Sequence, residues 1–226
     1  MGATPAAAPR IALIHALAHS VAPINEGFVR EWPEAVRMNL LDDSLSADLA
    51  RSSSGLDDVM TQRFLTLGDY AVGTGAQAIL FTCSAFGPCI EAVARRHADI
   101  PVLKPNEAMI EEALSRSQAA GGARIGLLAT FAPTLRSMPP EFPADAPLET
   151  ELATGALGAL DRGDAARHDE LIAEAARRLQ ARGCGIIALA QFSMARAAAL
   201  VAGATRLPVL TTVDSAVSKL RRVLRT

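Results

Sequence analysis

The sequence predicts an α/β protein made of two similar halves, each a mostly parallel sheet flanked by helices. Short runs rich in Ile, Leu and Val alternate with segments of helical periodicity, a pattern typical of βαβ units. Hydrophobic residues make up 50% of the chain and aromatic residues only 4%, which favours aliphatic helices packed on a buried parallel sheet. Segments of the first half also recur, in the same order, in the second half.

Seven apolar runs are predicted as strands: residues 10–15, 36–41, 78–82, 101–103, 124–129, 185–190 and 207–210. The helix with the clearest ends covers 165–182, where Asp164 is expected to cap the N-terminus and Gly183 to end the helix. The polar segment 51–55 and the proline-rich segment 138–147 are predicted as non-helical connections.

Three pairs of segments repeat along the chain: 9–14 and 123–128, 75–83 and 183–191, 101–103 and 208–210. Apolar strands also resemble one another by chance, but the conserved order favours a duplicated α/β half. We expect a first half at residues 1–117, with the C-terminal helix 212–226 packing back on it, and a second half at 118–211. Two such halves leave a cleft at the carboxyl ends of their strands.

Composition excludes several classes of protein. A net charge of −2 and a pI near 6.1 argue against nucleic-acid binding. The three cysteines, Cys83, Cys89 and Cys184, are too few for a disulfide framework, so a reducing cytoplasm fits best. The first residues lack the pattern of a signal peptide, and the least polar stretch, 183–195, falls well short of the ~20 residues of a membrane span.

Cys83 is the main candidate for a catalytic residue. It follows the predicted strand 78–82 and precedes Ser84, Ala85 and a helix whose first turn accommodates Pro88. Free backbone N–H groups near Ser84 and Ala85 are suited to hold a carboxylate. A cysteine near a helix N-terminus is expected to have a lowered pKa, which suits a base or nucleophile. The alternative is a buried cysteine that acts as a small hydrophobic residue.

Three segments, ILFTCSA at 79–85, RIGLLATFAPT at 124–134 and GCGIIALAQ at 183–191, resemble the aspartate/glutamate racemase superfamily. This superfamily includes hydantoin racemases, maleate isomerases and arylmalonate decarboxylases. The resemblance implies two pseudosymmetric α/β halves, a cysteine from each half on opposite faces of the substrate, no cofactor and a homo-oligomer. It maps the first catalytic cysteine onto Cys83 and the second onto Gln191.

Gln191 departs from the family pattern in a way that changes the chemistry. A racemase needs two groups that exchange protons, and a carboxamide does not titrate. The sequence therefore predicts a reaction through one thiol, and both decarboxylation and isomerisation stay open. Cys184 lies seven residues before Gln191, about 20 Å away along a strand, and is expected to be structural. Cys89 is expected to pack inside a helix, and its spacing from Cys83 matches no zinc pattern.

Polar residues after other strands are candidates for substrate binding. Thr130 and Thr134 resemble the family's carboxylate-binding hydroxyls, although Thr130 is equally suited to cap a helix. Ser193 occupies the position of Ala85 in the repeat and, like Ser84, is expected to bind substrate. These roles follow from the resemblance and from the repeat together.

Three further residues complete the expected site. His15 ends the first strand and is an acid/base, a carboxylate binder or a structural histidine. Lys104 is a possible carboxylate partner and Asn106 a hydrogen-bond donor, although each is also suited to cap a helix. His19 follows His15 at i+4, but no acidic third ligand is nearby, so no metal site is expected.

The sequence thus predicts a cofactor-independent enzyme that acts on a small carboxylate or related amide through Cys83. Racemase, isomerase and decarboxylase chemistry all fit this description. The alternative is a protein on the same fold that binds a small acid without transforming it. A nucleotide-binding domain is disfavoured because neither GxGxxG nor GxxxxGK[ST] follows a strand.

Overall fold

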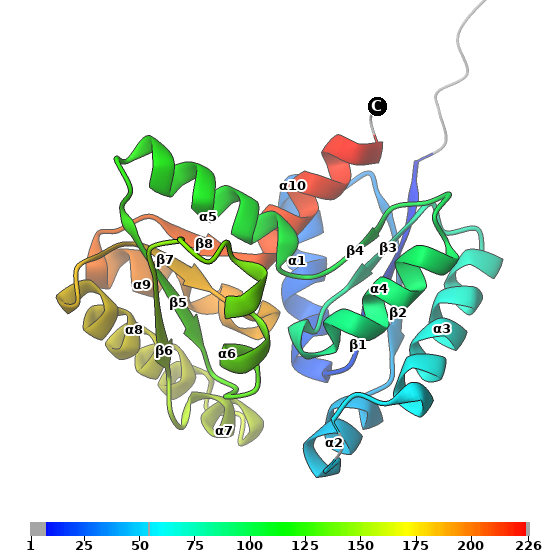
Figure 1. The fold of residues 1–226 in the computed structure, drawn as a ribbon, viewed down its shortest axis with the longest axis horizontal. Coiled ribbons are helices and arrows are strands. Elements are labelled where there is room, and N and C mark those ends of the chain that lie inside the picture. The colour runs from blue at the N-terminus through cyan, green and yellow to red at the C-terminus, as the bar shows by residue number, and fades with distance from the viewer. Residues whose placement is uncertain (1–7, 54, 225–226) are drawn as a thin grey trace, which may run out of the picture.

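The structure is a computed structural model that describes residues 8–53 and 55–224. It contains two four-stranded sheets in the order β2-β1-β3-β4 and β6-β5-β7-β8, and every strand pair is parallel. Helices flank both sheets, and the two sheets lie in separate halves of the molecule (Figure 1). The predicted fold class is confirmed.

The first sheet and its surroundings comprise β1 (Arg10–His15), η1 (Ala18–Ser20), α1 (Val21–Glu31), β2 (Val36–Leu41), α2 (Ser44–Arg51), α3 (Asp58–Gly73), β3 (Ala78–Phe81), η2 (Ser84–Phe86), α4 (Gly87–Arg96) and β4 (Val102–Leu103). The remainder comprises α5 (Glu107–Ala119), β5 (Arg124–Ala129), α6 (Thr134–Ser137), η3 (Pro139–Glu141), β6 (Leu148–Leu152), α7 (Ala156–Asp161), α8 (Ala165–Ala181), β7 (Cys184–Leu189), η4 (Phe192–Ala197), α9 (Ala198–Thr205), β8 (Val209–Thr211) and α10 (Thr212–Leu224). Labels beginning with η denote 3₁₀ helices.

Helix α8 forms as its sequence signals predict. The Asp164 carboxylate accepts a hydrogen bond from the backbone N–H of Arg167 at 3.1 Å, which satisfies one of the free donors of the first turn. Gly183 follows the helix with a φ of 83°, a conformation that glycine adopts without steric cost. The chain then turns directly into β7, the strand that leads to Gln191.

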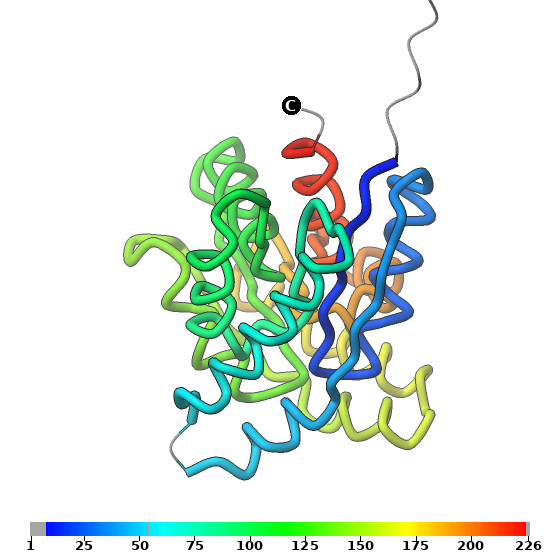
Figure 2. The backbone as a smooth tube through the Cα atoms, turned by 90° about the vertical axis from the view of Figure 1, so that its right-hand side faces the viewer, coloured from blue at the N-terminus to red at the C-terminus, as the bar shows by residue number. Residues whose placement is uncertain are grey.

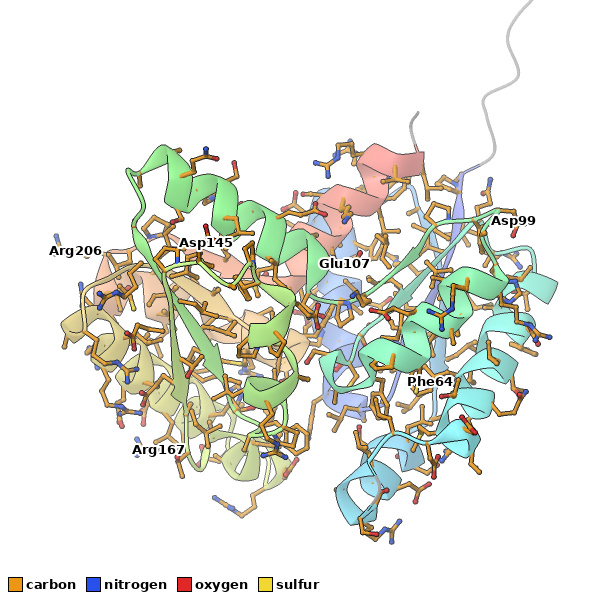
Figure 3. The ribbon with its side chains drawn as sticks, viewed as in Figure 1. Phe64, Asp99, Glu107, Asp145, Arg167 and Arg206 are labelled. Carbon is orange, nitrogen blue, oxygen red and sulfur yellow. The ribbon has the colours of Figure 1, made fainter. Side chains whose placement is uncertain are left out.

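Two helices connect the halves. Helix α5 follows β4 of the first sheet, yet its Met109 and Ile110 join the core beneath β5 of the second sheet. Helix α10 follows β8 of the second sheet, and its Val213 and Val217 pack in the core with β1 and α1 of the first sheet. Figure 2 shows α10 beside the N-terminal segments, and Glu107, the first residue of α5, lies where the halves meet (Figure 3). The division of the chain at residues 117 and 118 stays a prediction.

No helix in the described ranges has both the length and the hydropathy needed to cross a membrane.

Candidate functional site

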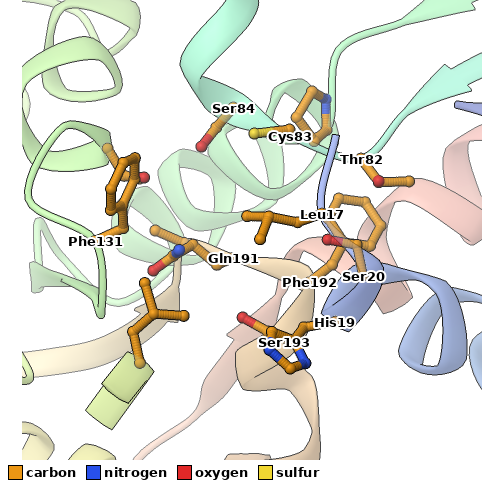
Figure 4. Close-up of a pocket in the computed structure, with 14 residues that line it drawn as sticks. Leu17, His19, Ser20, Thr82, Cys83, Ser84, Phe131, Gln191, Phe192 and Ser193 are labelled. Atoms are coloured by element: carbon orange, nitrogen blue, oxygen red, sulfur yellow. The ribbon is translucent and has the colours of Figure 1, made fainter. Parts of the chain in front are cut away.

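A cavity lies between the halves at the carboxyl ends of the strands, and residues of both halves line it (Figure 4). We call it the central cavity. The first half contributes Leu17, His19, Ser20, Thr82, Cys83, Ser84 and Pro105. The second half contributes Phe131, Thr134, Leu157, Ala190, Gln191, Phe192 and Ser193. Of the ten residues predicted for the site, the fold therefore brings Cys83, Gln191, Ser84, Thr134 and Ser193 to one space.

Cys83 reaches the central cavity because it lies two residues after the end of the fully buried strand β3. Its backbone is still extended, and the chain then turns into η2 and α4, with Pro88 in the first turn of α4. Next to this turn, the ring centroid of Phe64 lies 5.3 Å from that of Phe81 and 4.9 Å from that of Phe86. These aromatic contacts fix the segment that carries the thiol.

The pKa of the Cys83 thiol is raised, not lowered as the sequence predicted. Burial raises the pKa of Cys83 above its ordinary value because a thiolate loses solvation in an apolar setting. Hydrogen bonds from the backbone of Ala85 and the side chain of Ser46 oppose this effect without reversing it. The protonated thiol of Cys83 is therefore favoured, and a thiol can donate its proton.

Gln191 follows β7 and is held by Thr130. The backbone N–H and the hydroxyl of Thr130 both donate to Oε1 of Gln191, at 2.6 and 3.0 Å. Since a backbone N–H requires an acceptor, this contact also fixes which end of the carboxamide is the oxygen. Among the described residues, the Nε2 group of Gln191 has no hydrogen-bond partner, so it remains a donor for a ligand.

Thr130 and Thr134 have different surroundings. Thr134 is 2% exposed, lines the central cavity and begins α6. Thr130 does not line the cavity, because its hydroxyl turns to Gln191. Its observed contact supports Gln191 rather than a substrate, and it caps no helix.

His15 lies behind the wall of the central cavity rather than in it. Its ring is fully buried, with Nδ1 2.9 Å from the Thr82 hydroxyl and Nε2 3.0 Å from Oδ1 of Asn39. Burial lowers the pKa of His15, and the hydrogen bond to Asn39 opposes this in part. A neutral His15 thus holds Thr82, whose side chain does line the cavity.

The other predicted binding residues lie outside the central cavity. Ala85 and Lys104 line a separate side pocket together with Glu91 and Glu141. The Lys104 ammonium lies 3.0 Å from Glu91 and 3.8 Å from Glu141, so carboxylates of the protein already surround it. Asn106 is 1% exposed and does not line the central cavity.

His19 was not predicted as a site residue and was considered only as a metal ligand. It lines the central cavity, and its Nε2 lies 2.9 Å from Oδ1 of Asp161. The i+4 spacing from His15 was the available signal, but η1 turns the two rings to different surroundings. No group of three potential metal ligands occurs within the described ranges.

The central cavity is small. Its free space is about 20 Å³, enough for roughly one water molecule. A larger depression of about 540 Å³, the outer groove, lies next to it and is lined by Leu49, Leu56, Ala85, Phe131 and Arg136, among others. Because Phe131 lines both spaces, it separates the central cavity from the outer groove.

Comparisons with known proteins agree with this architecture. A family described as Asp/Glu/Hydantoin racemase matches residues 24–220. A glutamate racemase isoform from Bacillus anthracis superposes with a TM-score of 0.73 and 11% identity, over 96% of this chain and 82% of that one. Allantoin racemase from Klebsiella pneumoniae superposes with a TM-score of 0.71 and 18% identity, over 96% of this chain and 88% of that one. A mutant of arylmalonate decarboxylase superposes with a TM-score of 0.61 and 15% identity, over 95% of this chain and 92% of that one. Curated protein sequences give no significant match.

Proposed function

The chain belongs to the Asp/Glu/Hydantoin racemase family, and from this premise we propose that it is a cofactor-independent enzyme acting on a small carboxylate or related amide. Cys83 would transfer a proton to or from a carbon atom of the substrate. The observation that carries the proposal is the central cavity itself, where one thiol and one fixed carboxamide come from corresponding strand ends of the two halves.

The remaining polar groups of the cavity suit an anionic substrate. The hydroxyls of Ser84, Thr134 and Ser193 and the Nε2 group of Gln191 are hydrogen-bond donors in the cavity wall. Donors fixed by the protein stabilise negative charge that develops during a reaction. They are therefore suited to hold a carboxylate and the enolate that forms when an adjacent carbon loses a proton or carbon dioxide.

The substrate class is proposed from the comparisons. The similar structures include proteins named for glutamate, allantoin and arylmalonate. We propose a substrate of similar size to these three, with a carboxylate or an amide next to an acidic carbon. Because the free space of about 20 Å³ holds roughly one water molecule, the cavity has to widen when such a substrate binds.

Proton exchange with solvent tests the proposal. Both enantiomers of aspartate, glutamate and allantoin, and the achiral phenylmalonate, are incubated with the protein in D₂O and followed by ¹H NMR. A racemase replaces the α-proton of a chiral compound by deuterium and inverts its configuration, whereas a decarboxylase releases carbon dioxide from phenylmalonate. Cys83→Ala should abolish the activity, while Cys184→Ala, which alters a buried cysteine at the opposite end of a strand, should keep it.

A binding protein without turnover is the second candidate, and the carboxamide of Gln191 is the observation that favours it. Such a protein would bind one of these acids, as measured by calorimetry, with no deuterium incorporation and no loss of carbon dioxide. Full activity of the Cys83→Ala variant would contradict the thiol mechanism.

We further propose that the protein works in a reducing compartment and as a homo-oligomer. Cys83 has to stay a free thiol to transfer protons, and a reducing cytoplasm maintains that state. The homo-oligomer is what the resemblance to the racemase superfamily implies. Light scattering of the purified protein measures the oligomeric state.

A further inference from the structure

Two side chains around the central cavity carry acid/base groups. Among the described residues that line it, these groups are the thiol of Cys83 and the imidazole of His19, and the others carry hydroxyl, amide or apolar groups. Gln191 occupies the position of a second acid, but a carboxamide does not serve as one. A proton delivered to the face opposite Cys83 therefore comes from His19 or from water.

His19 stands on the wall of the cavity opposite Cys83. It belongs to η1, which packs against η4, the turn that follows Gln191. Figure 4 shows His19 beside Ser193, with Cys83 on the far side and Leu17 between them. The imidazole therefore comes from the first half of the chain but lies on the side of the second.

A carboxylate of the second half orients this imidazole. Asp161, the last residue of α7, places Oδ1 2.9 Å from Nε2 of His19. Because a carboxylate only accepts, Nε2 carries a proton, and Nδ1 is left as the atom that exchanges protons with a ligand. Nδ1 has no hydrogen-bond partner in the part of the chain that the structure describes. The His19 side chain is 33% exposed, so water can replace its proton.

We infer that His19 is the acid/base group that acts opposite Cys83 and that Asp161 is its positioning residue. The inference rests on the proposed function, in the form of proton transfer at a carbon atom. A histidine–aspartate contact as exposed as this one contributes little to stability. Its place at the central cavity is better explained by chemistry than by folding.

The proton transfers balance over a full cycle. Neutral Nδ1 of His19 removes the proton from the carbon next to the substrate carboxylate, and the C–H electron pair passes into an enolate. The Cys83 thiol donates its proton to the opposite face of that carbon, which leaves an imidazolium and a thiolate. In the other direction the thiolate removes the proton and the imidazolium donates one. Transfer through water restores the starting state.

The resting state of Cys83 agrees with the first of these directions. Because burial raises the pKa of the thiol, the ligand-free protein holds Cys83 with its proton in place. A neutral imidazole and a neutral thiol are the pair that this direction requires.

The experiment compares the variants His19→Gln, Cys83→Ser and Asp161→Asn in D₂O, using both enantiomers of aspartate, glutamate and allantoin as probes. His97→Gln is the matched control, because His97 makes the same 2.9 Å contact with Asp69 but lies away from the central cavity. Racemisation is measured by polarimetry and deuterium incorporation by ¹H NMR. Circular dichroism and thermal unfolding of each variant establish that it is folded.

We expect His19→Gln to lose racemisation by about 100-fold or more while it still exchanges the α-proton of the enantiomer that Cys83 faces. Cys83→Ser should retain exchange of the other enantiomer. Asp161→Asn should lower kcat by about tenfold with little change in KM, because it weakens a charge-assisted hydrogen bond to the imidazole.

Racemisation by His19→Gln within threefold of the unmodified protein would overturn the inference, as would equal loss of exchange from both enantiomers. If the unmodified protein exchanges no α-proton with any probe, the proposed function fails first, and the inference with it. These results separate the failure of His19 from the failure of the racemase chemistry.

Discussion

Thr130 holds Gln191 by two hydrogen bonds to one oxygen atom, from its backbone N–H at 2.6 Å and from its hydroxyl at 3.0 Å. The first residue after β5 thereby fixes a residue that follows β7 in the same sheet. The carboxamide is held by its acceptor end, and its donor end is left for the cavity. In both halves, the side chain near the strand end thus offers a ligand a hydrogen-bond donor. This donor is the thiol of Cys83 in the first half and the amide of Gln191 in the second.

Removal of the Thr130 hydroxyl should weaken catalysis more than stability. Thr130→Val keeps the backbone donor and the shape of the side chain but loses one of the two bonds to Gln191. We expect kcat/KM in the deuterium-exchange assay to fall about three- to tenfold, the effect of one hydrogen bond. Thr130→Ser, which keeps the hydroxyl, should restore most of it. Equal rates for the two variants would show that the hydroxyl does not position Gln191.

Ser46 should control the reactivity of Cys83 from outside the cavity. Its hydrogen bond lowers the pKa of the thiol against the larger effect of burial, so Ser46→Ala should raise that pKa further. Iodoacetamide reacts with the thiolate, and we expect labelling of Cys83 at pH 8 to slow about three- to tenfold. Peptide mass spectrometry follows the reaction. Ala47→Ser, an exposed change on the same helix, serves as the control and should leave the rate unchanged.

His15 should link stability to pH. The pKa of His15 is lowered by burial below its ordinary value of 6.5, so folding favours the neutral ring. Its contribution is present above pH 6.5 and is lost as the pH falls through the folded-state pKa. His15→Ala leaves the polar groups of Thr82 and Asn39 without this partner and should lower the free energy of unfolding at pH 7.5 by about 2–4 kcal/mol.

Urea unfolding at pH 7.5, 6.0 and 5.0 measures this link. The difference between the unmodified protein and His15→Ala should shrink as the pH falls, because only the unmodified protein has to protonate this ring on unfolding. A difference that stays constant over this range would contradict a neutral His15 in the folded state.

The sequence predicted most of the sheet because its central strands are continuous apolar runs. The central strands β1 and β5 begin and end at the predicted residues, 10–15 and 124–129, and so does the edge strand β2 at 36–41. β6 was missed, since Leu148–Leu152 contains Glu149 and Glu151 and lies at the edge of its sheet, where few residues are buried. Its pairing with β5 comes from tertiary contacts that a local pattern does not contain.

The sequence likewise predicted some residues of the candidate site and not the surroundings of others. Cys83 and Gln191, which each lie two residues after the end of a strand, were placed at the cleft because parallel strands end at one edge. The surroundings of His15, Lys104 and Thr130 depend on which neighbouring side chains claim their polar atoms, and those partners are distant in sequence. The pairing of His19 with Asp161 joins residues 142 positions apart, and no local signal predicts it.

Close packing of α1 on α10 should make Gly27 sensitive to substitution. A Cβ atom at Gly27 would lie 2.4 Å from Cγ1 of Val213, so Gly27→Ala forces the two helices apart and should cost about 1–3 kcal/mol. Gly73→Ala is the matched control, since no atom lies within 4 Å of its added Cβ, and it should gain up to about 1 kcal/mol. Urea unfolding of both variants gives the comparison. If both substitutions changed the free energy of unfolding in the same direction, the packing argument would be contradicted.

Phe131 should control access to Cys83. Phe131 lines both the central cavity of about 20 Å³ and the outer groove of about 540 Å³, so Phe131→Ala should join the two spaces. We expect iodoacetamide to label Cys83 about tenfold faster in this variant, because exposure governs the reaction of a thiol as strongly as its pKa does. Leu49→Ala shortens a side chain that lines only the outer groove and should leave the rate within twofold. If the two variants react equally fast, reagents reach the thiol by another route, such as separation of the halves.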